Sequence, residues 1–223
     1  MGAIYLIRHG QASFGADDYD VLSGLGRVQA RALGAELARR ETAVSLAWCG
    51  TLSRQRATAE LALAEVTGGI SGISVETDAR WNEYDHVEIA AHHGGGLAQD
   101  SADPRAYQHM LEHALRAWVE AGAGSPCAET WPMFLARVRA AFADVVSRVG
   151  TGQRAAVFTS GGVISTLCGD LLGDPVTGLL SLNRVAVNAG LSKAVTGRSG
   201  TTLVSFNEHG HVDGETVGLL TYR

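Results

Sequence analysis

The chain has 223 residues, 46% of them hydrophobic and 18% charged, which predicts one folded domain with a large buried core and argues against disorder. Its formal net charge of −5 argues against general nucleic-acid binding and membrane-surface binding, because both require a basic field. This charge does not exclude a small anionic substrate, since a few local arginines are enough to hold one.

The N-terminal segment and the cysteines predict a cytoplasmic protein. Residues 1–7 carry no basic residue ahead of an apolar run that is too short for a signal peptide. No stretch approaches the ~20 apolar residues of a membrane span. Cys49, Cys127 and Cys168 have no metal-binding or CxxC spacing, and we expect them to be buried apolar side chains in a reducing compartment.

Strand and helix patterns alternate in the first third of the chain. Continuous apolar runs at 3–7 and 45–49 are typical of buried parallel strands, and 75–79 is a further short strand. A helical repeat of apolar residues follows Ser23, which is a suitable N-cap, and a second helix is expected over about 54–65.

The stretch from about 84 to 129 differs from its surroundings. It holds a glycine run at 94–96 and a helix over about 107–121, and a second group of glycines follows that helix. We expect this stretch to be a cap inserted into a single domain that spans residues 1–223.

The last part of the chain returns to alternating elements. A long helix is predicted after Thr130, with Pro132 in its first turn. A strand at 155–158 leads into another helix, and 191–195 and 203–206 are further strand candidates. The whole pattern predicts a three-layer α/β sandwich, a mostly parallel sheet flanked by helices.

The segment Arg8-His9-Gly10 directly follows the first predicted strand. Ligands bind at the carboxyl ends of strands in open parallel sheets, so His9 is expected to lie in a cleft. A neutral imidazole is a good phosphoryl acceptor, and the planar fork of an arginine suits phosphate oxygens. The tripeptide alone fits a structural histidine equally well.

Three further segments have features that suit the binding or the cleavage of a phosphate ester. Arg54 lies in the first turn of a helix, where its cation gains nothing from the helix dipole unless an anion binds there. Glu83 could protonate a departing alkoxide and then activate water. Gly161 and Gly162 begin a helix whose free N–H groups favour an anion. Each residue alone also fits an ordinary solvated or turn position.

Taken together and in this order, the motifs resemble the histidine phosphatase superfamily, the phosphoglycerate-mutase-like group. The similarity covers nearly the whole chain. It rests on Leu6-Ile7-Arg8-His9-Gly10, Leu22-Ser23 with Gln29-Ala30, Leu52-Ser53-Arg54 with Thr58-Ala59, Glu83, Thr159-Ser160-Gly161-Gly162-Val163-Ile164 and Ser205-Phe206-Asn207-Glu208-His209.

The resemblance implies a role for each matched residue. His9 would become phosphohistidine, and Glu83 would be the proton donor and later the base. Arg8 and Arg54 would bind the phosphoryl oxygens. Ser160 and Gly161, in the matched motif at 159–164, are expected to contact the phosphate as well. The family uses no metal or other cofactor, and its variable cap, here 84–129, selects the substrate.

The sequence departs from the family at Ser160, where a second histidine is usual. A serine hydroxyl still donates one hydrogen bond, and the loss of a charge-assisted bond would cost about 1–3 kcal/mol. His86 is a hypothetical replacement because it follows Glu83 closely. The pair at 92–93 is expected in the cap, and His209 and His211 in a surface or loop segment.

The function predicted from these features is phosphomonoester hydrolysis through phosphohistidine, on a small phosphorylated metabolite or a phosphoprotein. A phosphoglycerate-mutase-type phosphotransferase is the first alternative. It ranks lower because the cap lacks the long, charge-rich segment in which the mutases of this family resemble each other. The second alternative is a weakly active or inactive phosphate-binding protein, and only Ser160 supports it.

Overall fold

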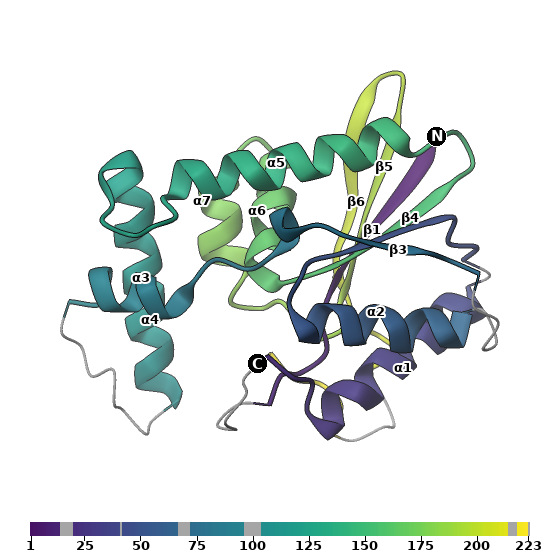
Figure 1. Ribbon diagram of the computed structural model, residues 1–223, viewed down its shortest axis with the longest axis horizontal. Coiled ribbons are helices and arrows are strands. Elements are labelled where there is room, and N and C mark those ends of the chain that lie inside the picture. Colours follow the sequence, from purple (N-terminus) through teal and green to yellow (C-terminus); the bar gives the residue numbers. More distant parts are fainter. Residues whose placement is uncertain (14–19, 41, 67–71, 96–103, 214–217, 223) are drawn as a thin grey trace.

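The computed structural model describes residues 1–13, 20–40, 42–66, 72–95, 104–213 and 218–222. They form one six-stranded sheet in the order β3-β2-β4-β1-β5-β6 (Figure 1). The strands are β1 (Gly2–Arg8), β2 (Leu46–Cys49), β3 (Val75–Thr77), β4 (Arg154–Thr159), β5 (Leu191–Gly197) and β6 (Gly200–Glu208). The first four run parallel, and β5 and β6 run antiparallel at one edge. The predicted α/β fold is confirmed, with a mixed sheet.

Helices cover both faces of the sheet (Figure 1). The helices on the two faces are α1 (Gly24–Arg39) with α2 (Ser53–Val66), and α5 (Trp131–Arg148) with α6 (Gly161–Leu171). Along β1, Ile4 and Leu6 pack in the core with α5 and α6, while Tyr5 and Ile7 pack in the core with α1 and α2. Both faces of the strand are therefore buried, which explains its continuous apolar run.

Two predicted helix starts are found at the expected positions. Ser23 caps α1, and its hydroxyl accepts a hydrogen bond from the N–H of Gly26. Thr130 precedes α5 and Pro132 lies in the first turn, but the Thr130 side chain makes no capping bond. The main-chain turn at Pro132 therefore begins α5 without help from a side-chain cap.

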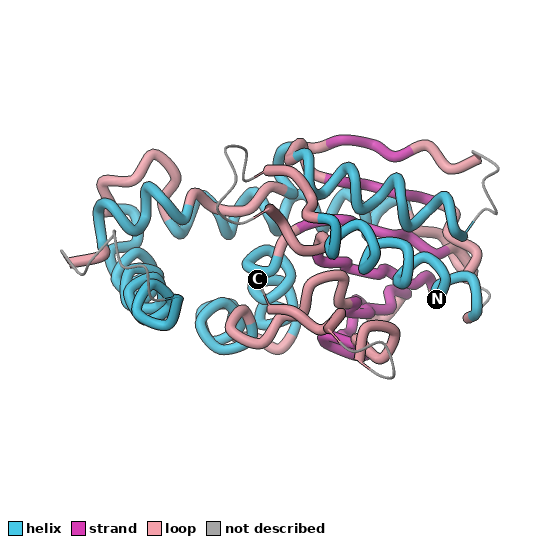
Figure 2. Tube along the Cα trace, turned by 90° about the horizontal axis from the view of Figure 1, so that it is seen from below, coloured by secondary structure: helices cyan, strands magenta, loops and turns pink. Residues whose placement is uncertain are grey.

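The stretch predicted to be a cap, for which we keep that name, contains α3 (His86–His93), α4 (Pro104–Ala121) and the short η2 (Gly122–Gly124). Both α3 and α4 lie beyond the end of the sheet (Figures 1 and 2). Tyr84, Trp118 and Phe134 join the cap to α5, with ring centroids 5.7–5.8 Å apart. Such aromatic pairs contribute roughly 0.5–1.5 kcal/mol each beyond the area they bury. Because Tyr84 follows Glu83 directly, this packing also fixes the loop that carries Glu83.

A segment that no sequence pattern indicated lies between α6 and β5. It forms α7 (Pro175–Thr177) and a π-helical turn, η3 (Gly178–Leu182). Gly169 and Gly178 bring the backbones of α6 and η3 together, since a Cβ on either glycine would lie 2.5 Å from the other's Cα. This close packing places η3 beside the cap. Within the described ranges, no helix is long and apolar enough to cross a bilayer.

Candidate active site

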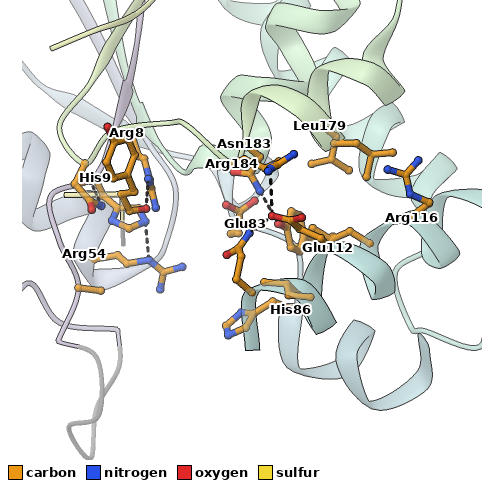
Figure 3. A pocket seen from close by; sticks show the side chains of 18 residues that line it. Arg8, His9, Arg54, Glu83, His86, Glu112, Arg116, Leu179, Asn183 and Arg184 are labelled. Atoms are coloured by element: carbon orange, nitrogen blue, oxygen red, sulfur yellow. Dashed lines mark hydrogen bonds and ion pairs between the residues drawn. The ribbon is translucent and has the colours of Figure 1, made fainter. Parts of the chain in front are cut away.

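The carboxyl ends of β1 and β4 lie side by side. Arg8 pairs with Thr159 across the two strands, so His9 and Ser160 are the next residues at adjacent strand ends. The helix α2 begins at the same edge, directly after β2. These connections bring Arg8, His9 and Arg54 to one side of a pocket of about 180 Å³, and Glu83 lines the same pocket from the other side (Figure 3).

The hydrogen bonds of His9 determine which ring nitrogen carries the proton. Nδ1 lies 2.7 Å from the carbonyl oxygen of Gly10, which only accepts, so Nδ1 is the protonated nitrogen. Nε2 accepts a hydrogen bond from Nε of Arg54 at 3.1 Å. The imidazole is therefore neutral, with the lone pair of Nε2 directed at Arg54.

The surroundings of His9 stabilise this neutral form. Burial, together with the cations of Arg54 and Arg8, lowers the pKa of His9 well below its ordinary value, although its bond to the Gly10 carbonyl acts in the opposite direction. Only 6% of the residue is exposed. The imidazole thus remains unprotonated, as a nucleophile requires, in mildly acidic solution.

Both arginines are held by defined partners. Nη1 of Arg54 forms an ion pair with Oδ1 of Asp20 at 2.7 Å, and Oδ2 of Asp20 accepts from the N–H of Ser53 at 2.7 Å. Nη1 of Arg8 donates to the carbonyl oxygens of Ala186 and Tyr222. These contacts fix the two guanidinium groups beside His9.

Glu83 is placed by a close approach to the start of α6. Its Oε2 accepts from the N–H of Gly162 at 2.9 Å, whereas Oε1 is buried without a hydrogen-bond partner among the described residues. A Cβ at Gly162 would lie 2.5 Å from Oε1, so this position requires glycine. Burial raises the pKa of Glu83, although the Gly162 bond and the cations of Arg54 and Arg8 oppose the rise. A raised pKa suits a proton donor.

Ser160 and Gly161 lie beside the pocket, and neither belongs to the described residues that line it. Ser160 is fully buried, and its Oγ accepts from Nε2 of Gln55 at 2.8 Å. Gly161 is packed against Arg8 and Asn183. Direct contact between either residue and phosphate stays a prediction.

The structure places His86, the hypothetical replacement for a second active-site histidine, apart from the other histidines singled out in the sequence. His86 begins α3 and lines the pocket from the cap (Figure 3). His92 and His93 end α3 and do not belong to the described lining. His209 and His211 follow β6, and their rings hydrogen-bond to the carbonyl oxygens of Asn207 and Ala189, respectively. Among these histidines, only His86 is positioned to touch a bound molecule.

One face of α4 supplies much of the outer pocket wall, which sequence reasoning missed. Its contributors recur at positions i, i+3, i+4, i+7 and i+8, a spacing that puts them on one side of a helix and could have indicated a common face. They are Gln108, Leu111, Glu112, Leu115 and Arg116.

The opposite part of this outer wall comes from η3 and the turn after it, where Leu179, Leu180, Asn183 and Arg184 line the pocket. An ion pair of 3.3 Å joins Arg184 to Glu112 of α4. Nε2 of Gln108 donates to the same Glu112 carboxylate at 2.6 Å. The far end of the pocket therefore combines leucines with a bound pair of opposite charges.

The α/β fold thus holds, at the carboxyl end of a parallel strand, a pocket in which a neutral histidine lies beside two arginines. The sequence matches the family described as histidine phosphatase superfamily (branch 1) over residues 4–209. The chain therefore belongs to the histidine phosphatase superfamily, and the resemblance seen in its motifs is confirmed. No curated protein sequence shows a significant match.

Solved structures share the fold over nearly the whole chain. A phosphoserine phosphatase mutant from Entamoeba histolytica matches with a TM-score of 0.65 and 16% identity, over 95% of this chain and 100% of that one. A phosphoglycerate mutase from Bacillus anthracis matches at 0.67 and 21%, over 94% of each chain. A mycobacterial glucosyl-3-phosphoglycerate phosphatase matches at 0.64 and 25%, over 93% and 99%. Both phosphatases and a mutase thus share this architecture.

Proposed function

We propose that the protein hydrolyses phosphomonoesters through a phosphohistidine at His9, without a metal ion. The observation that carries this proposal is that His9 and Glu83 line one pocket together with Arg8 and Arg54. An unprotonated Nε2 on His9 and a buried Glu83 carboxyl group with a raised pKa line one pocket. An unprotonated imidazole nitrogen and a carboxyl group with a raised pKa, placed in one pocket, suit the roles of nucleophile and proton donor in the cleavage of a phosphate ester.

In the first step, the Arg54 N–H that bonds to Nε2 of His9 turns to a phosphoryl oxygen, and the freed lone pair of Nε2 attacks phosphorus as the bond between phosphorus and the ester oxygen breaks. Arg8 and Arg54 stabilise the charge on the phosphoryl oxygens, and Glu83 gives its proton to the departing alkoxide. In the second step, water attacks phosphorus while Glu83 takes a proton from it. The phosphorus–nitrogen bond breaks, which releases phosphate and returns His9 and Glu83 to their initial states.

The size and charge of the pocket favour a small metabolite as the substrate. Its volume of about 180 Å³ lies below the roughly 300–1,000 Å³ typical of drug-sized ligand sites. Arg184 and Glu112, which line the same pocket, add charged groups joined by an ion pair. We therefore propose a small phosphorylated molecule as the partner. The cytoplasm is the proposed location, in keeping with the free, buried Cys49, Cys127 and Cys168.

Turnover of a broad panel of phosphorylated metabolites tests this function against its alternatives. Release of inorganic phosphate from p-nitrophenyl phosphate and from some panel members is the expected result. Interconversion of phosphoglycerates that depends on 2,3-bisphosphoglycerate would support the mutase instead. Phosphate binding with no turnover of any panel member would overturn the proposal in favour of a binding protein.

Removal of the Asp20 charge is expected to weaken the phosphate clamp. In Asp20→Asn, Arg54 loses its ion pair, and we expect kcat/KM for p-nitrophenyl phosphate to fall about tenfold, the equivalent of about 1.4 kcal/mol. Asp144→Asn is the matched control, because Asp144 is paired with Arg80 away from this pocket. Equal activity of the two variants would contradict this role of Asp20.

A further inference from the structure

A glutamine side chain is buried directly behind the phosphate pocket. Gln55 lies in the first turn of α2, next to Arg54, and is 0% exposed. Its Nε2 donates to Oγ of Ser160 at 2.8 Å and to the carbonyl oxygen of Trp81 at 3.1 Å. Both amide hydrogens are therefore used, and the amide is held in one orientation.

The contact with Gln55 fixes the direction in which Ser160 can donate. Because Oγ of Ser160 accepts from Gln55, its own hydrogen is left for another acceptor, and it donates to no other described residue. The register of β1 and β4 puts Ser160 at the strand end next to His9, about 5 Å away between Cα atoms. A phosphoryl group on His9 would offer an acceptor there.

The space around Gln55 is fitted to this arrangement. A Cβ at Gly50 would lie only 1.9 Å from Oε1 of Gln55 and 2.5 Å from Oδ1 of Asn82, so the glutamine amide requires glycine at that position. Ser160 is 0% exposed and 2.8 Å from the same amide. A histidine at position 160 would need the space that the Gln55 amide fills.

We propose that Gln55 is a positioning residue for phosphoryl transfer, an inference that rests on the proposed function. It holds the Ser160 hydroxyl as a donor toward the phosphoryl group and fills the volume that a larger side chain at position 160 would take. Gln55 and Ser160 thus act as one unit in place of the family's second histidine. Gln55 itself touches neither substrate nor the reacting atoms.

A double-mutant cycle tests whether the two residues act through each other. Gln55→Ala and Ser160→Ala are each expected to lower kcat for p-nitrophenyl phosphate about tenfold with little change in KM, and the double variant should be no slower than the slower single one. Ser160→Thr, which keeps the hydroxyl, should restore most of kcat. Ser165→Ala, a buried hydroxyl elsewhere in α6, is the matched control and should leave kcat unchanged. Multiplying effects in the double variant would overturn the proposal.

Introduction of a histidine tests the shared volume. Ser160→His alone should lower both kcat and the melting temperature, and addition of Gln55→Ala should recover both. Full activity and stability of Ser160→His with Gln55 in place would overturn the proposal. If the wild-type protein cleaves no phosphate ester, the proposed function fails. The melting temperatures of the wild type, Gln55→Ala, Ser160→His and the variant with both changes then still show whether position 160 and Gln55 compete for space.

Discussion

His9→Ala is expected to lower kcat/KM for phosphomonoester hydrolysis by more than about 10⁴-fold, the order of loss when a covalent nucleophile is deleted. Nε2 of His9 is the unprotonated ring nitrogen in the pocket and accepts a hydrogen bond from Arg54. An alanine leaves the arginines to bind phosphate, but no group to accept the phosphoryl moiety. Steady-state assays with p-nitrophenyl phosphate measure the loss.

His93→Ala provides the control for this variant. His93 is bonded to Ser125 within the cap and does not belong to the described pocket lining, so its loss should leave turnover nearly unchanged. Binding of inorganic phosphate by His9→Ala, measured by calorimetry, would show that the pocket is still formed. Retention of a tenth or more of wild-type turnover by that variant would contradict a covalent role for His9.

Glu83→Gln is expected to separate substrates by their leaving groups. For an alkyl phosphate, which must receive a proton as it leaves, kcat/KM should fall about 10²–10⁴-fold. For p-nitrophenyl phosphate, which leaves as a stable phenolate, the fall should be much smaller. The two substrates are compared by kcat/KM because this constant reports only the steps up to transfer of the phosphoryl group to His9. An equal loss with both substrates would exclude Glu83 as the proton donor.

The pH dependence of the alkyl-phosphate reaction follows from the pKa values of Glu83 and His9. Burial raises the pKa of Glu83, so the acid form persists to higher pH than for an exposed glutamate, and kcat/KM should fall as pH rises through that value. The pKa of His9 is lowered well below 6.5, so the loss of activity in acid should begin only well below that pH. Glu83→Gln should abolish the fall on the basic side.

The core of the fold could be predicted because burial leaves a simple trace in the sequence. Strands such as β1 and β4 are buried on both faces and are therefore apolar without interruption. Arg8 and His9 end such a strand, and Arg54 opens a helix at the same edge. That Arg8, His9 and Arg54 lie close together could be predicted, because the carboxyl ends of parallel strands meet at one edge of the sheet. The placement of Glu83 relied on resemblance, since a single acidic residue in a loop carries no pattern of its own.

The remaining parts of the site depend on contacts between distant positions, which leave no local pattern. Asp20 meets Arg54 only because the fold brings their segments together. Leu179 and Leu180 enter the pocket from a π-helical turn that no periodicity indicates. Ser160 was predicted as a phosphate ligand in isolation, whereas its hydroxyl is bonded to Gln55, 105 positions earlier. The residue at one position of the sequence could not reveal a hydrogen-bond partner so far away in the chain.

The most direct test of the mechanism is detection of the phosphorylated enzyme itself. Protein mixed with a phosphomonoester should be quenched in alkali within milliseconds, digested and analysed by mass spectrometry, because phosphohistidine survives alkali and is lost in acid. We expect one added phosphoryl group on His9, which disappears when the substrate is consumed and never forms in His9→Ala. Turnover without any phosphorylated His9, or with the group on another residue, would contradict the assignment of His9 as the nucleophile.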